Sequence, residues 1–214
     1  MKKQEKRSLK IIDIIKEHIQ KNLKQYLIIS IIFIIGILLG VIFVNNVNTN
    51  EQKEISEYIN NFINALKSDY TIDTNVLLKS TIINNVIIAV ALWFIGSTVV
   101  GIPIVYGIIG VRGFSLGYTI AAIVATLGTW KGICFGIVTL FFQNIIFIPC
   151  ILALAVSGMK LYKSILKDKR KENIKTEIYR HTIFSAIMAI CLIISAFVEV
   201  YISSNLLTTC ISFL

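Results

Sequence analysis

Long apolar stretches alternate with short charged segments along this chain, and the alternation predicts the fold. A helix needs about 20 apolar residues to cross roughly 30 Å of hydrocarbon. We therefore expect an all-α integral membrane protein, a bundle of about five transmembrane helices. The expected spans lie near residues 26–44, 82–109, 113–129, 132–158 and 183–203. The stretch 113–129 is so short that it has to draw on flanking residues, thin the bilayer or enter it without crossing.

The segments between the spans are polar, and they differ in charge. Residues 1–25 form a basic arm with the apolar periodicity of an amphipathic helix, which would lie at a membrane surface or pack on the protein's own loops. Residues 45–81 form an acidic loop, largely a second amphipathic helix. Residues 159–182 form another basic loop, and residues 204–214 form a C-terminal tail that is either ordered at the interface or frayed.

Two local features subdivide the apolar stretches. Pro103 predicts a kink in the second span, and Arg112 marks the end of that span. Gly36 and Gly40 form a G-x-x-x-G pair in the first span, a spacing that lets another helix approach closely but that also arises by chance in apolar sequence.

Basic residues predict the orientation, because cytoplasmic loops beside spans are enriched in Lys and Arg. With five spans, the basic arm, Arg112 and the basic loop share one side of the membrane, and the acidic loop and the C-terminus share the other. The N-terminus is then cytoplasmic and the C-terminus extracytoplasmic.

Composition agrees with this interpretation. The chain is 56% hydrophobic, has a mean hydropathy of +0.78 and is only 15% charged, whereas soluble domains carry roughly a quarter charged residues. The net charge of +9 comes from clusters bordering the spans, so anionic membrane lipid is the expected partner and nucleic acid is not.

Signs of catalysis or cofactor binding are missing from the sequence. It contains no P-loop, nucleophile elbow, zincin or dinucleotide-binding motif. The four cysteines lack metal or redox spacing, and His18 and His181 lie in basic segments at membrane borders, where an interfacial or solvated role is expected. We expect no catalytic residue, no metal and no cofactor, and therefore no enzyme.

Polar residues inside the spans are the candidate functional residues, because an unpaired amide or carboxylate in hydrocarbon is costly. They are Asn84, Asn85, Gln143, Asn144 and Glu199. Three roles are open for them: hydrogen bonds between helices, a substrate or ion pathway, or contact with a partner protein. Glu199 has no obvious Lys or Arg to pair with inside the membrane.

The stretch from Thr81 to Lys160 carries a family resemblance. It begins TIINNVIIAVALWFIG and continues through an Arg-Gly turn to the FFQNIIFIP of the fourth span. These motifs, in this order and between a basic arm and a last span ending in Glu, resemble the stage II sporulation protein M family. The matching positions, taken as packing or contact points, are Asn84, Asn85, Gly113, Gly117, Gln143, Asn144, Pro149 and Glu199.

The resemblance implies a membrane scaffold in the septal and engulfing membrane of sporulating cells. Such a protein serves forespore engulfment by recruiting two peptidoglycan-degrading partners, stage II sporulation proteins D and P, without being hydrolytic itself. The expected docking face is the 45–81 loop with the span ends near Asn84 and Glu199. The alternative is a small-solute or ion transporter with a polar site around Gln143 and Asn144.

Overall fold

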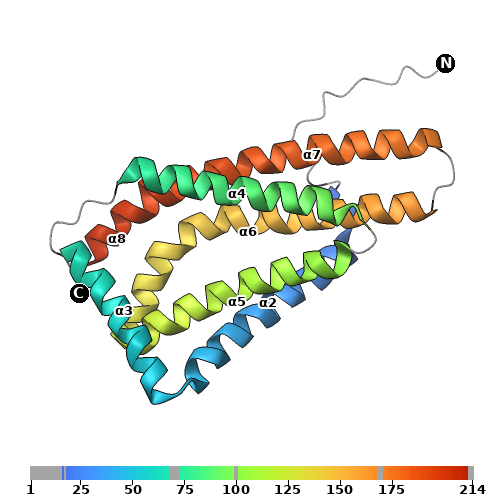
Figure 1. Cartoon of the computed structure of the whole chain (residues 1–214). Coiled ribbons are helices and arrows are strands. Elements are labelled where there is room, and N and C mark those ends of the chain that lie inside the picture. The colour runs from blue at the N-terminus through green and yellow to red at the C-terminus, as the bar shows by residue number, and fades with distance from the viewer. Residues whose placement is uncertain (1–15, 17, 68–72, 99–100, 168–170, 212–214) are drawn as a thin grey trace.

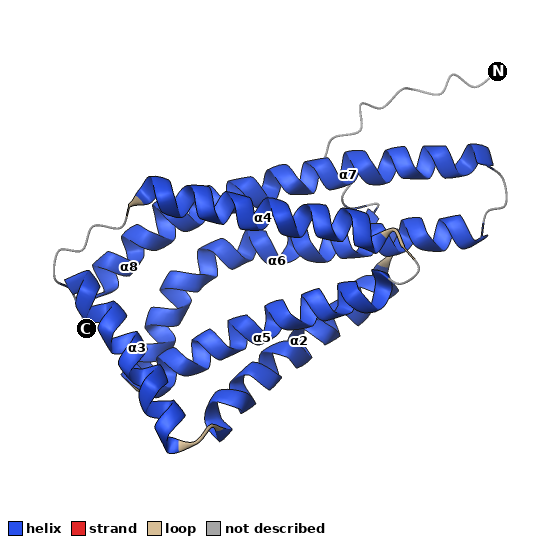
Figure 2. Ribbon diagram, viewed as in Figure 1, coloured by secondary structure: helices blue, strands red, loops and turns tan. Residues whose placement is uncertain are grey.

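The computed structural model describes residues 16, 18–67, 73–98, 101–167 and 171–211. Within these residues every regular element is helical and no strand occurs (Figure 2). Five helices are long and apolar enough to span a bilayer, which confirms the predicted all-α membrane bundle. Most of the N-terminal arm lies outside the described residues, so its amphipathic helix remains a prediction.

The helices follow one another with short connections. They are α2 (Leu23–Asn46), α3 (Thr49–Lys67), α4 (Thr74–Gly96), α5 (Gly101–Leu127), α6 (Thr129–Lys167), α7 (Lys171–Val198), the π-helical turn η1 (Glu199–Ser203) and α8 (Ser204–Ile211). The last three form one continuous helix, because the backbone stays helical on both sides of η1.

The spans pack as two pairs with α6 between them (Figure 1). One pair is α2 with α5, and the other is α4 with α7. The two pairs converge at one end of the bundle and separate toward the other, where α3 lies across the opening and contacts both α5 and α8. We call these the basic end and the α3 end.

The two ends differ in charge. The basic end holds the start of α2, the end of α6 and the start of α7, with Lys21, Lys24, Lys160 and Lys163. The α3 end holds acidic side chains beside its lysines, and the carboxylate of Asp73 caps α4 by accepting hydrogen bonds from the backbone N–H groups of the helix's first turn.

The structure corrects the predicted boundary between the second and third spans. α4 ends at Gly96, and α5 runs without interruption from Gly101 to Leu127. Pro103 lies in the first turn of α5, where its missing N–H has no helical partner to lose, so it begins a helix instead of kinking one. Arg112, the predicted end of a span, lies in the middle of α5.

The corrected third span is long enough to cross the membrane. With 27 residues, α5 is about 40 Å long. It runs parallel to α2, because Gly36 faces Gly110 while Gly40, further along α2, faces Phe114 further along α5. If every span crosses the membrane completely, the first and third spans run in the same direction, as α2 and α5 do.

Polar flanks extend other helices beyond the apolar stretches. α4 begins at Thr74, inside the predicted acidic loop, and α6 and α7 continue through most of the predicted basic loop. Hydropathy identifies the part of a helix that lies in lipid, whereas backbone hydrogen bonds can continue the same helix beyond the lipid into water. Gly128, with a φ of +83°, makes the tight turn that separates α5 from α6.

Candidate functional site

A hydrogen-bonded amide and carboxyl pair lies between α6 and η1. The Gln143 side chain donates from Nε2 to Oε2 of Glu199 at 2.5 Å, and both residues are half-buried. The backbone carbonyl of Gln143 also accepts a hydrogen bond from the Ser195 hydroxyl at 3.3 Å. Gln143 therefore fixes α6 to the last helix through both its side chain and its backbone.

Arg112 supplies the positive charge that the sequence analysis did not find for Glu199. The two side chains interact electrostatically across the bundle. The Arg112 guanidinium carbon also lies 4.9 Å from the centre of the Phe147 ring, within the range of a cation–π contact. The sequence analysis did not pair Arg112 with Glu199, because it placed Arg112 at the end of a span. In the structure Arg112 lies in the middle of the membrane-spanning helix α5.

Glu199 is also where the last helix changes geometry. It is the first residue of the π-helical turn η1. Such turns are rare and occur frequently at functional sites, because they insert one extra residue and redirect nearby side chains. Nothing in the local sequence signals the turn.

The Gln143–Glu199 pair borders a cavity of about 950 Å³ beneath α3. Its walls come from α3, α4, α5, α6, η1 and α8, and most of the lining side chains are apolar. Examples are Ile55, Ile59, Phe62, Ala122, Ile123, Phe135, Leu140 and Leu207. The polar groups near the pair are Thr139, Ser203 and Ser204, and Glu54 and Tyr58 line the cavity from α3. Sequence periodicity indicated an apolar face on α3 but not that a hollow lies under it.

The other candidate amides have different surroundings. Asn85 is buried and donates to the Leu192 carbonyl of α7 at 2.9 Å, a hydrogen bond between helices. Asn84 is exposed on the surface of α4. Asn144 donates to Leu140 within its own helix, and it does not line the cavity beside Gln143. The structure therefore separates the two residues of each predicted pair.

Gly113 and Gly117 belong to the contact between α2 and α5. A Cβ built on either would overlap the backbone carbonyl of Phe33 or Ile37 in α2. In return, Gly36 and Gly40 lie against the backbone of α5. Because all four positions lack a Cβ, the two helices approach to backbone contact.

Pro149 lies inside α6 on its exposed side. With 39 residues α6 would be about 58 Å long if straight, and Figure 1 shows that it bends. Proline removes one backbone hydrogen bond and is the usual cause of a helix kink. The bend directs the first half of α6 along the wall of the cavity.

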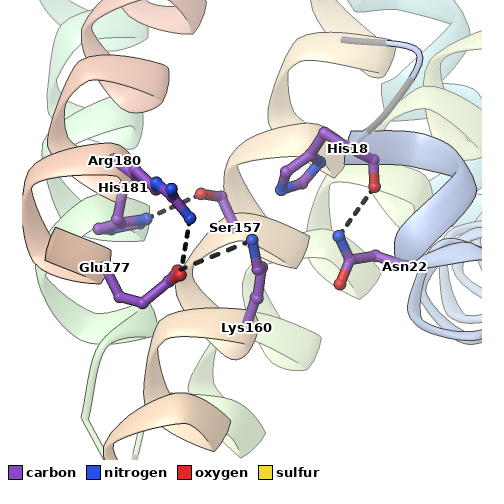
Figure 3. Close-up of polar contacts among 7 residues, drawn as sticks. All are labelled: His18, Asn22, Ser157, Lys160, Glu177, Arg180 and His181. Carbon is purple, nitrogen blue, oxygen red and sulfur yellow. Dashed lines mark hydrogen bonds and ion pairs between the residues drawn. The ribbon is translucent and has the colours of Figure 1, made fainter. Parts of the chain in front are cut away.

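A second polar cluster, at the basic end, was not predicted (Figure 3). His181 is buried, with Nδ1 2.8 Å from the Ser157 hydroxyl and Nε2 3.3 Å from the Trp93 carbonyl of α4. This differs from the interfacial or solvated role expected at a membrane border, because α7 begins earlier than its hydropathy indicates. Close by, Glu177 forms ion pairs with Lys160 at 3.7 Å and with Arg180 at 3.2 Å.

His18 joins this cluster from the segment before α2. Its Nδ1 lies 3.1 Å from the Tyr26 hydroxyl, and its ring stacks on Phe184 with the ring centres 4.3 Å apart. Burial, with smaller contributions from the nearby charges of Lys160 and His181, lowers the pKa of His18 to about 4. The imidazole is therefore neutral at physiological pH.

The comparisons with known proteins rest on a family model. The model described as stage II sporulation protein M matches residues 29–204, which include both polar clusters except His18 and Tyr26. No curated protein and no solved structure matches the chain. The match therefore covers α3, three whole spans and most of the first and last spans.

Proposed function

The chain belongs to the stage II sporulation protein M family and is a sporulation-related multi-pass membrane protein; from this we propose that it is a membrane scaffold for forespore engulfment. In this proposal it recruits peptidoglycan-degrading partners, stage II sporulation proteins D and P, to the septal membrane. The scaffold catalyses no reaction itself.

The observation that carries the proposal is the position and surface of α3. This helix is the longest described segment outside the five spans, and it lies across one end of the bundle (Figure 1). One side of α3 lines the cavity. Glu51 and Glu57 of the same helix do not line the cavity and are exposed. Partners that act on the cell wall work outside the cytoplasm, so we assign the α3 end to the extracytoplasmic side.

The orientation has independent support from charge. The basic end carries Lys21, Lys24, Lys160 and Lys163 next to the spans, as cytoplasmic ends do. Anionic lipid of the cytoplasmic leaflet is the partner that this end favours.

Transport is the alternative function, and the cavity gives it weaker support. A pathway for a solute or ion needs polar groups along its length, whereas the polar groups here gather near Gln143 and Glu199 between apolar walls. A flux into proteoliposomes that is lost in Gln143→Leu would favour transport over the scaffold.

The test is an affinity pull-down of the tagged, full-length protein from sporulating cells, with co-purifying proteins identified by mass spectrometry. We expect two wall hydrolases with the wild type. The double variant Glu51→Lys/Glu57→Lys should lose them, because it reverses the charge of the exposed side of α3. Lys175→Glu, a charge reversal at the basic end, should retain them. Recovery of neither hydrolase with intact wild-type protein would contradict the proposal.

A further inference from the structure

We propose that the cavity beneath α3 binds a neutral amphiphile, a lipid-like molecule with an apolar chain and an uncharged hydroxyl-bearing head. The cavity has the properties of a small-molecule site. Its volume of about 950 Å³ lies within the usual range for ligand pockets, and its lining is mostly apolar with a few polar groups.

An unpartnered hydroxyl points to a ligand. Ser203 lines the cavity and is only 6% exposed, and its Oγ has no hydrogen-bond partner among the residues that the structure describes. A buried polar group is normally hydrogen-bonded, because leaving it without a partner costs free energy. A hydroxyl on the ligand would supply that partner, and Gln143 and Glu199 offer further hydrogen-bonding atoms nearby.

The charges around the cavity select a neutral head. Among the described residues that line it, none is Lys or Arg, and Glu54 contributes a carboxylate, so an anionic head would meet no counterion there. The positive charge of Arg112 weakens the attraction of Glu199 for a cationic head, and the other carboxylate, Glu54, is exposed to water, which screens its charge. A head without net charge fits both conditions.

The membrane supplies such a molecule directly. The walls formed by α5, α6 and η1 belong to candidate spans, so this side of the cavity is formed by helices that contact lipid in a membrane. Neither Glu51 nor Glu57, the residues altered to test the scaffold, lines the cavity. The two proposals can therefore fail separately.

The test is thermal unfolding of the purified full-length protein in detergent with three amphiphiles that share one chain: monooleoylglycerol, oleylamine and oleate. A ligand that binds only the folded state raises the midpoint with concentration. We expect a saturable rise with monooleoylglycerol at concentrations where oleylamine and oleate have little effect.

A matched pair of serines identifies the site. Ser203→Ala should raise the apparent Kd for monooleoylglycerol by about fivefold to tenfold, as expected for one lost hydrogen bond. Ser185 is likewise 6% exposed and without a partner among the described residues, but it lies outside this cavity, so Ser185→Ala should leave the Kd unchanged. Equal effects of the three amphiphiles, equal effects of the two variants, or no shift at all would overturn the proposal.

Discussion

At the scale of single residues, Glu199 shows how a charged group is accommodated inside this bundle. Its carboxyl group accepts a hydrogen bond from Gln143 of α6 and interacts electrostatically with Arg112 of α5, so two other helices contribute to its surroundings. The sequence identified Gln143 and Glu199 as unusual because both are polar within apolar stretches. It could not pair them, since they lie 56 positions apart and the contact depends on how α6 packs on η1.

A double-mutant cycle measures this contact. Gln143→Leu leaves the Glu199 carboxyl group without its amide donor, and we expect it to lower the free energy of unfolding by about 1–3 kcal/mol. In a Glu199→Leu background, Gln143→Leu should lower the free energy of unfolding by less, because the carboxyl group that would lose its donor is absent. Denaturation of the single and double variants in detergent gives the coupling energy. Additive effects would contradict a direct interaction.

His18 predicts a pH dependence of stability. Its pKa is about 4 in the folded protein, against 6.5 for an unperturbed histidine, so the unfolded chain binds the proton more tightly between these values. The stabilising contribution is complete above pH 6.5 and is lost as the pH falls toward 4. The unfolding midpoint should decrease over this window, and less steeply in His18→Gln. Parallel curves for the two proteins would show that His18 does not titrate in this way.

At the scale of elements, the contact between α2 and α5 rests on glycines at a spacing of three or four residues. The spacing of Gly36 and Gly40 allowed a close helix contact but did not distinguish it from chance. It also did not point to a partner helix, because every span is apolar and most contain glycine. The partner glycines, Gly113 and Gly117, lie in a helix whose start was misplaced. Gly101 and Pro103 were the local signal for the start of α5. The sequence analysis placed the boundary between the spans at Arg112 instead, because of its charge.

Glycine-to-alanine variants within α5 test this contact. A Cβ at Gly113 would overlap the Phe33 carbonyl, so Gly113→Ala should destabilise the protein by about 1–3 kcal/mol. Gly107 in the same helix has open space where its Cβ would lie, so Gly107→Ala should be neutral or slightly stabilising. Thermal unfolding of both variants in detergent provides the measurement. A loss in Gly107→Ala as large as that in Gly113→Ala would indicate a general need for glycine.

At the scale of the whole molecule, the number of spans and the asymmetry of charge were predictable, because hydropathy and the distribution of Lys and Arg are properties of the sequence. The arrangement of the two helix pairs was not. It depends on contacts such as that of Gly96 with Gly158, where a Cβ on Gly158 would lie 2.8 Å from the Gly96 Cα. Contacts of this kind involve residues far apart in the chain and leave no periodic signal.

Cysteine labelling tests the proposed orientation of the molecule. Tyr58 on α3 is 76% exposed, and Tyr179 in the first turns of α7 is 68% exposed. α3 and the start of α7 lie at opposite ends of the bundle (Figure 1). After replacement of the four native cysteines by alanine, Tyr58→Cys should react with a membrane-impermeant maleimide on intact cells. Tyr179→Cys should react only after permeabilisation. The reverse pattern would place the α3 end in the cytoplasm.

The π-helical turn makes the last helix sensitive to chain length. Because η1 accommodates one residue more than an α-helical turn, α8 is rotated by about 100° from where an unbroken α-helix would place it. Leu207 lines the cavity from this rotated position. Deleting a single residue from 199–203 would restore the ordinary helix and turn Leu207 away. In the evolution of this segment, insertions and deletions would thus reshape the cavity wall more abruptly than most substitutions.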